Sequence, residues 1–121
     1  CDIYSDQIAF LQLFFDHFGI NGTATVCDLT HALPDQPVQV ALLLKSIPCL
    51  EQLDKNIPLR LLKGIPAQHW LVSFPAHSLG GRGKGMRDNY RQHFEEIIQG
   101  WQVSQQVFDF PGELVFLLSP A

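Results

Sequence analysis

The segment that decides the fold is HWLVSFPAHSLGGRGKG, residues 69–85, in which an apolar strand runs into a loop rich in glycine and positive charge. Residues 69–74 have the composition of a buried strand, and Pro75 ends it because proline cannot donate a ladder hydrogen bond. Four glycines follow within six residues, with Arg82 and Lys84 between them. Glycine lets a ligand approach the backbone closely, and open α/β sheets bind ligands at the carboxyl ends of their strands. The loop therefore predicts a ligand site.

Positive charge is concentrated around this loop. Residues 82–91 contain four of the eight Lys and Arg residues, whereas residues 1–44 contain five acids and neither Lys nor Arg. Arg87 and Arg91 fall on the helix that we expect after the loop, four residues apart and therefore on one face. Although the net charge is −4, this asymmetry favours a local anionic partner such as a phosphate group.

The overall composition is that of one soluble globular domain over residues 1–121. Apolar residues make up 46% of the chain and charged residues 17%, which excludes intrinsic disorder. No apolar run reaches the roughly 18–20 residues of a membrane span. The three cysteines have no CxxC spacing, which indicates reduced thiols in the cytoplasm. The five histidines lack metal-ligand spacing, so we expect no metal site.

The first part of the chain predicts a strand end, a helix and a second strand. Residues 1–4 resemble the end of a strand, and Asp6 is a suitable N-cap for a helix over residues 7–18. Gly19 is placed to follow that helix in a left-handed conformation. Residues 23–28 then predict a short β-branched strand that closes on an acid.

The rest of the chain alternates strands and helices. Residues 38–45 form an apolar run with a single lysine at its end, which is typical of a strand buried on both faces. The other expected elements are helices over residues 47–56, 59–64 and 88–99, and strands over residues 69–74, 101–110 and 113–118. The last two strands meet at Pro111-Gly112 and read as a hairpin. This order predicts an α/β fold whose sheet is mostly parallel, with an antiparallel C-terminal hairpin at its edge.

Three of the expected strands end in a charged residue: Asp2, Asp28 and Lys45. The carboxyl ends of parallel strands share one rim of the sheet, so we expect these side chains to lie close together. In a nucleotide-binding sheet, Asp2 could accept the two ribose hydroxyls, and Asp28 with Leu29 could hold an adenine ring. The alternative is that both acids cap loose backbone N–H groups, and the residues alone leave the two interpretations open.

Several familiar motifs are absent from the glycine loop. A phosphate-binding P-loop needs glycine where Ser78 stands and serine or threonine where Gly85 stands. Ser78 also lacks the G-x-S-x-G elbow of a nucleophilic serine. The pattern GxGxxG fails because its third glycine is replaced by Met86. A solvated turn with incidental charge is the alternative interpretation of the loop.

Two stretches, ALLLKSIPCLEQ (residues 41–52) and SFPAHSLGGRGKGMRDNY (residues 73–90), resemble the aminoglycoside-resistance methyltransferases. Members of that family transfer a methyl group from S-adenosylmethionine to ring nitrogen seven of a guanine in 16S ribosomal RNA of the small subunit. The resemblance runs through the chain and includes the sequence GELV at residues 112–115. It implies a Rossmann-like class I methyltransferase sheet and a ribosomal RNA partner.

The resemblance also implies roles for individual residues. Asp2 with Ile3 would hold the cofactor ribose, Asp28 with Leu29 the adenine, and Leu44 would lie beside the methionine part. The RNA side would be formed by Lys45, Ser78, Arg82, Lys84, Arg87 and Arg91. No general base is expected, because the guanine ring nitrogen is already a nucleophile and the reaction depends on alignment and charge.

Two features depart from the family pattern. Tyr4 stands where a second aspartate is often found. In addition, the first strand, the glycine-rich cofactor motif and the N-terminal RNA-binding helices of the family would all precede Cys1. We therefore expect this chain to be the C-terminal part of such an enzyme and to be inactive alone. A non-catalytic RNA-binding module and a small-molecule methyltransferase remain alternatives, and the oligomeric state is not indicated.

Overall fold

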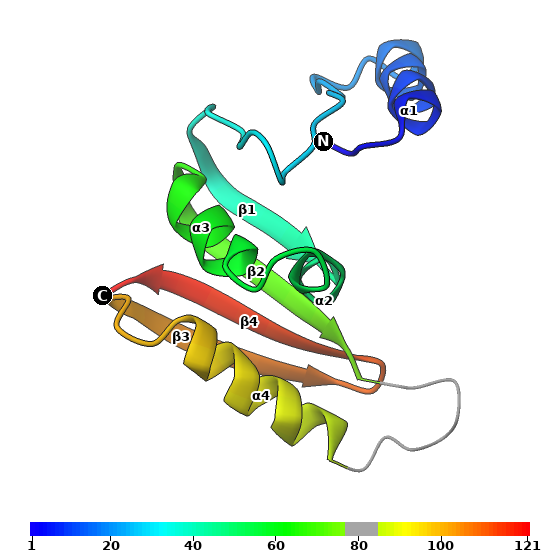
Figure 1. The fold of residues 1–121 in the computed structure, drawn as a ribbon. Helices are drawn as coiled ribbons and strands as arrows, with labels where there is room; N and C mark the ends of the chain where they lie inside the picture. Colours follow the sequence, from blue (N-terminus) through cyan, green and yellow to red (C-terminus); the bar gives the residue numbers. More distant parts are fainter. Residues whose placement is uncertain (77–84) are drawn as a thin grey trace. The chain divides into compact units, whose positions relative to one another are not determined.

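A computed structural model describes residues 1–76 and 85–121 (Figure 1). The chain divides into two compact units, Cys1–Pro34 and Asp35–Ala121, and each is described by itself. The expectation of one domain over residues 1–121 stays a prediction.

The first unit is built on helix α1, Ser5–His17. The helix begins two residues earlier than expected, so Asp6 lies in its first turn, where its carboxylate accepts a hydrogen bond from the backbone N–H of Gln7 at 2.9 Å. Asp6 is therefore not the N-cap. Gly19 follows the C-cap residue Phe18 with φ 64°, which confirms the predicted left-handed end of the helix.

The strand predicted over residues 23–28 is wrong in extent. Within the described part of this unit, the pairing is a single parallel bridge between Asp2 and Val26. The segment that contains Asp2 is followed at Ser5 by helix α1, so it is too short to extend the bridge into a pair of strands. In addition, the side-chain carbonyl of Gln12 accepts the backbone N–H of Ala24 at 2.8 Å, which satisfies that donor without a strand.

The second unit contains a four-stranded sheet in the order β1-β2-β4-β3. Its strands are β1 (Val38–Leu44), β2 (Ala67–Pro75), β3 (Val103–Phe110) and β4 (Glu113–Pro120). β1 pairs with β2 in parallel, and β4 pairs antiparallel with both β2 and β3. Three strands therefore point the same way and β4 is reversed (Figure 1), which confirms the predicted α/β sheet with an antiparallel C-terminal hairpin. The reversed strand is inserted inside the sheet rather than placed at its edge.

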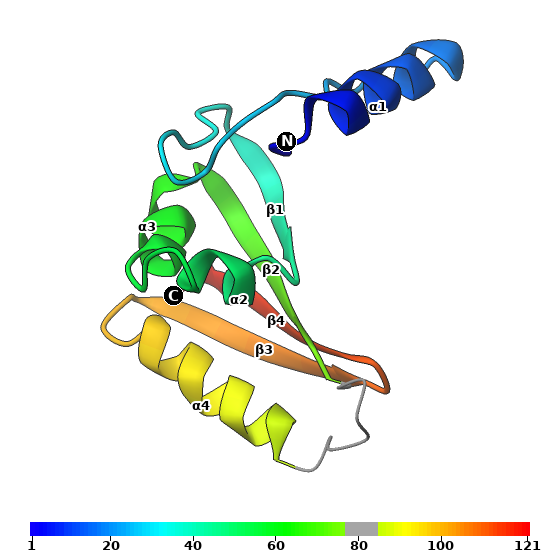
Figure 2. The same cartoon turned by 45° about the vertical axis from the view of Figure 1, so that its right-hand side comes forward.

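Three helices of this unit lie on one face of the sheet in both views of the ribbon (Figures 1 and 2). They are α2 (Ile47–Glu51), α3 (Ile57–Gly64) and α4 (Met86–Ile97). The helix expected over residues 47–56 is shorter, because a turn follows it in which the Asp54 carboxylate accepts the Asn56 backbone N–H at 2.8 Å. Pro58 lies in the first turn of α3, where proline is tolerated.

The core of the second unit is an aromatic cluster between β2, β4 and α4. Phe74, Phe94 and Phe116 are completely buried, and their ring centroids lie 4.5 to 5.8 Å apart. Tyr90 stacks on Phe74 at 4.9 Å. Burying three such rings fixes α4 on the sheet, because aromatic side chains contribute the largest areas to a core.

The expectation that the first long strand is buried on both faces is wrong for this chain. Along β1 the side chains alternate, so that Leu43 is buried whereas Val40, Leu42 and Leu44 are exposed. β1 is the outer strand of this sheet. The described helices of the unit, α2, α3 and α4, all lie on one face of the sheet, so they leave the other face of β1 uncovered (Figure 2).

Candidate functional site

The two acids at the predicted strand ends lie on neighbouring extended segments of the first unit. The bridge between Asp2 and Val26 is held by two backbone hydrogen bonds, from the N–H of Asp2 to the carbonyl of Thr25 at 3.2 Å and from the N–H of Cys27 to the carbonyl of Asp2 at 2.9 Å. Asp28 follows two residues after Val26. The local fold therefore brings two carboxylates to one short pair of extended segments.

Asp2 uses one carboxylate oxygen as a cap. Its Oδ1 accepts the backbone N–H groups of Ile3 at 2.6 Å and of Tyr4 at 3.2 Å. Among the described residues, Oδ2 receives no hydrogen bond, and the residue is exposed. The capping and ligand-binding interpretations are thus compatible, because one oxygen orients the carboxylate and the other can accept hydroxyl donors.

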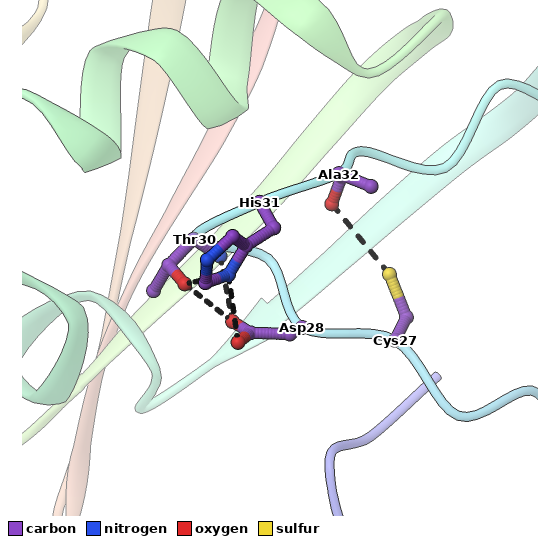
Figure 3. A network of polar contacts seen from close by, with 5 residues as sticks. All are labelled: Cys27, Asp28, Thr30, His31 and Ala32. Carbon is purple, nitrogen blue, oxygen red and sulfur yellow. Dashed lines mark hydrogen bonds and ion pairs between the residues drawn. The ribbon is translucent and has the colours of Figure 1, made fainter.

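Asp28 is the centre of a polar network, which Figure 3 shows from close by. Its Oδ1 accepts the backbone N–H of Thr30 at 2.9 Å and the Thr30 hydroxyl at 2.6 Å. Its Oδ2 lies 3.0 Å from Nδ1 of His31, and its backbone carbonyl accepts the N–H groups of His31 and Ala32. The hydrogen bonds from the Thr30 side chain and backbone, with smaller contributions from His31, lower the pKa of Asp28 below its ordinary value of 3.8.

The network fixes the tautomer of His31. The Thr30 hydroxyl donates to the Asp28 carboxylate, so the oxygen of that hydroxyl faces Nδ1 of His31, 2.8 Å away, as an acceptor. Both neighbours of Nδ1 are then acceptors, and Nδ1 must carry the proton. The Nε2 atom of the neutral ring is left as an acceptor on a side chain that is 82% exposed.

Counting lone pairs tests whether Asp28 can hold a ligand. Each carboxylate oxygen can accept about two hydrogen bonds. Oδ1 has both positions filled by Thr30, whereas Oδ2 has one position left beyond His31 among the residues that the structure describes. The side chain is 42% exposed, so a single donor such as an aromatic amine can reach it. Asp2 and Asp28 therefore fit the hydroxyl and amine donors of an adenosine.

Lys45 is held in a strained conformation at the carboxyl end of β1. Its φ is 55°, the left-handed region that residues other than glycine rarely adopt. The backbone N–H of Lys45 lies 3.1 Å from the carbonyl oxygen of Ser73 and 3.2 Å from its hydroxyl oxygen. Such strain persists only where the surroundings impose it, and it is concentrated at functional sites. Leu44, beside it, is exposed at the same end of the strand.

Ser73 was not predicted as a site residue. It lies on β2, is completely buried, and pairs with Leu44 across the parallel strands. Its hydroxyl supports the turn at Lys45. A serine within the apolar run WLVSF is the signal that could have identified it, because a buried hydroxyl needs a hydrogen-bond partner.

The two arginines expected to contact RNA both have a partner inside the protein. Arg87 and Arg91, on α4, form ion pairs with the two carboxylate oxygens of Asp109 on β3. Arg87 also donates to the backbone carbonyl of Pro111 at 2.8 Å. These contacts tie the start of α4 to the β3–β4 hairpin. Their role toward RNA stays a prediction, and Ser78, Arg82 and Lys84 lie outside the described residues.

Two other findings concern the described residues as a whole. Within residues 1–76 and 85–121, no group of three or more His, Cys, Asp and Glu side chains is arranged to hold a metal ion. In the same part of the chain, no helix combines the length and the apolar character that crossing a membrane requires.

The family model described as "Ribosomal RNA methyltransferase (FmrO)" matches residues 1–117 of this chain. Two similar curated proteins are both named 16S rRNA (guanine(1405)-N(7))-methyltransferase. The protein from Micromonospora echinospora is 32% identical over 117 residues, covering 97% of this chain and 43% of the relative. The protein from Serratia marcescens is 35% identical over 118 residues, covering 98% of this chain and 47% of the relative. The chain thus spans less than half the length of these relatives.

A solved structure with the same fold is that of the 16S rRNA methyltransferase RmtF in complex with S-adenosyl-L-homocysteine. It superposes with a TM-score of 0.86 at 31% identity, and the match covers 94% of this chain and 44% of RmtF.

Proposed function

The chain belongs to the FmrO family of ribosomal RNA methyltransferases, and from this we propose that it carries the adenosine contacts and the target-base contacts of a methyl transfer to a guanine ring nitrogen in 16S ribosomal RNA. The cofactor is S-adenosylmethionine, and the biological outcome is aminoglycoside resistance. The observation that carries the proposal is the family match over residues 1–117. Compartment and RNA partner follow from the same proposal: the protein acts in the cytoplasm on the small ribosomal subunit.

The first unit carries the residues that we propose to contact the adenosine part of the cofactor. Asp2 accepts ribose hydroxyls through Oδ2, because its Oδ1 is engaged in the cap before α1. Asp28 accepts the adenine amine through the remaining position on Oδ2, with Ile3 and Leu29 beside the sugar and the ring. S-adenosylmethionine, when bound, supplies an electrophilic methyl group. The choice of cofactor is supported by the structure of RmtF, which is in complex with S-adenosyl-L-homocysteine.

In the second unit, the end of β1 carries the residue that we propose to contact the target base. The strained turn at Lys45 fixes the direction in which its side chain leaves the strand. Guanine exposes the acceptor O6 beside N7 on one edge. An ammonium group that donates a hydrogen bond to O6 therefore orients the base and leaves the lone pair of N7 available for the reaction. The ring nitrogen needs no base to remove a proton, and the residues contribute alignment and charge. Leu44 lies beside the methionine part, and Ser78, Arg82 and Lys84 contact the RNA.

The test is mass spectrometry of 16S ribosomal RNA from cells that express the complete reading frame encoding this chain. We expect N7-methylguanine in the small-subunit RNA and none in cells carrying the Lys45→Ala variant. Methylated RNA in the variant at the unaltered level would contradict the role of Lys45. Methylation of a small molecule and not of RNA would contradict the proposed substrate. Calorimetry with S-adenosylmethionine on the 121-residue chain itself is expected to give weak or no binding.

A further inference from the structure

A solvent-open hollow of about 450 Å³ lies in the second unit. It is formed by the start and outer face of α3 and by the last residue of α4. Its lining consists of Lys55, Asn56, Leu59, Arg60, Lys63 and Ile97. We call these six residues the basic hollow. Three of the eight basic residues of the chain therefore gather around one concave surface.

The charges of two of these residues are not neutralised by the protein. Lys55 and Lys63 are exposed; Lys55 lies in the turn before α3, and Lys63 lies in the last turn of that helix. Within residues 1–76 and 85–121, neither lysine is within ion-pair distance of an acid. This contrasts with Arg87 and Arg91, whose charges are balanced by Asp109.

An anion would stabilise this arrangement. Lys55 and Lys63 line the same hollow and carry like charges, which repel each other. Because the net charge of the chain is −4, a cluster of three cations is a local feature of this surface. The hollow also offers the Asn56 amide as a donor and the apolar side chains of Leu59 and Ile97 between the cations. Such a lining suits a charged group attached to a less polar body, as in a nucleotide.

We propose that the basic hollow is a second RNA-contact surface, which binds the phosphodiester backbone of ribosomal RNA. The inference rests on the proposed function and adds a contact that the sequence motifs did not indicate. RNA presents one negative charge per nucleotide, and lysine binds phosphate as a point charge without fixed geometry. Phosphate contacts of this kind position a protein on its nucleic acid and do not read sequence.

The hollow lies near the start of β2, at the opposite end of that strand from Pro75. Lys63 is followed after three residues by the first residue of β2, whereas the loop follows the last residue of that strand, Pro75. A nine-residue strand is roughly 25–30 Å long, at about 3.3 Å per residue. We expect the basic hollow and the glycine loop to contact separate parts of the RNA, and substitutions in them to have additive effects on the binding free energy.

The test is filter binding to small ribosomal subunits over a series of salt concentrations. The variant Lys55→Gln with Lys63→Gln removes both charges, and Lys55→Arg with Lys63→Arg is the matched control that keeps them. We expect the Gln variant to reduce the slope of log affinity against log salt by roughly 1.4 to 1.8, which is about 0.7–0.9 for each phosphate that a lysine no longer neutralises. The Arg variant should keep the slope, and both should keep the thermal midpoint because the lysines are exposed.

Two results would overturn the inference alone. The first is normal subunit binding with an unchanged slope in the Gln variant. The second would come from a parallel assay with polyglutamate as the ligand. If the Gln variant lost a polyglutamate binding that the unaltered chain has, and still bound subunits, the partner of the hollow would be an acidic protein. By contrast, failure of the unaltered chain to bind subunits at any salt concentration would count against the proposed function as well.

Discussion

The Nε2 atom of His93 on α4 lies 2.8 Å from both carboxylate oxygens of Glu51, the last residue of α2. The two residues are 42 positions apart. Glu51 is 19% exposed and His93 47%, so the contact lies at the edge of the core rather than in open solvent. It links the helix that follows β1 to the helix that follows the glycine loop.

This link predicts a measurable contribution to stability. Glu51→Gln keeps the shape of the side chain and removes its charge, and we expect the free energy of unfolding to fall by roughly 0.5–1.5 kcal/mol. Urea denaturation measures the change. The matched control is Glu96→Gln, because among the described residues the Glu96 carboxylate accepts a hydrogen bond only from the Gln92 side chain of the same helix. Equal midpoints for the two variants would show that the contact does not stabilise the fold.

The pKa of Asp28 predicts a pH dependence of its turn. Because the folded-state pKa is lowered from 3.8, the ionised carboxylate stabilises the turn above that value, and this stabilisation is lost as pH falls through the folded-state pKa. A carbon NMR titration of the carboxyl group should give a midpoint below 3.8. Thr30→Val removes the principal donor and should raise the midpoint, whereas Thr25→Val should leave it unchanged. A midpoint at or above the ordinary value in the unaltered protein would contradict the network.

The positive φ of Lys45 predicts an unusual ranking of two substitutions. Lys45→Ala and Lys45→Gly both remove the amine, but only glycine adopts φ 55° without strain. We expect the Gly variant to be more stable than the Ala variant by about 0.5–1 kcal/mol, because relief of a left-handed residue is partly offset by the entropy of glycine in the unfolded chain. Equilibrium unfolding in urea decides the order. Higher stability of the Ala variant would mean that the turn at Lys45 is not strained.

The pairing of Asp109 with two arginines predicts an effect on RNA binding. Asp109→Asn should weaken the attachment of α4 to β3, and it should also release Arg87 and Arg91 for RNA phosphates. We therefore expect a steeper salt dependence of subunit binding than in the unaltered protein. Asp88→Asn, on the exposed side of α4, changes the net charge equally and serves as the control. The same slope in both variants would mean that the arginines serve only to attach the helix.

The sequence predicted those parts of the fold that depend on neighbours along the chain. The apolar runs of β1 and β2, the hairpin at Pro111-Gly112 and the helix end at Gly19 are all determined by residues a few positions apart. The exposure of alternate residues in β1 could not be predicted from neighbouring residues, because an apolar run has the same composition whether helices cover one face of the strand or both.

In the candidate site, too, contacts between residues close in the sequence could be predicted, whereas contacts between distant residues could not. The donors to Asp28 are two and three residues away, so an acid followed by a threonine two positions later predicts such a turn. The support of Lys45 by Ser73 spans 28 positions, and the pairing of Arg87 with Asp109 spans 22. Spacing in the sequence does not reveal such contacts, which is why the arginines suggested only an RNA role.

The place of β4 between β2 and β3 sets the order in which the protein can fold as it is synthesised. β3 leaves the translating ribosome before β4, yet among the described strands it pairs with β4 alone. It therefore waits without a partner until β4 has emerged, and the short turn at Pro111-Gly112 then allows the two to form a hairpin within microseconds. β4 also pairs with β2, through pairs such as Trp70 with Leu118, so the hairpin joins the rest of the sheet through β4. Completion of the sheet thus waits for the synthesis of β4.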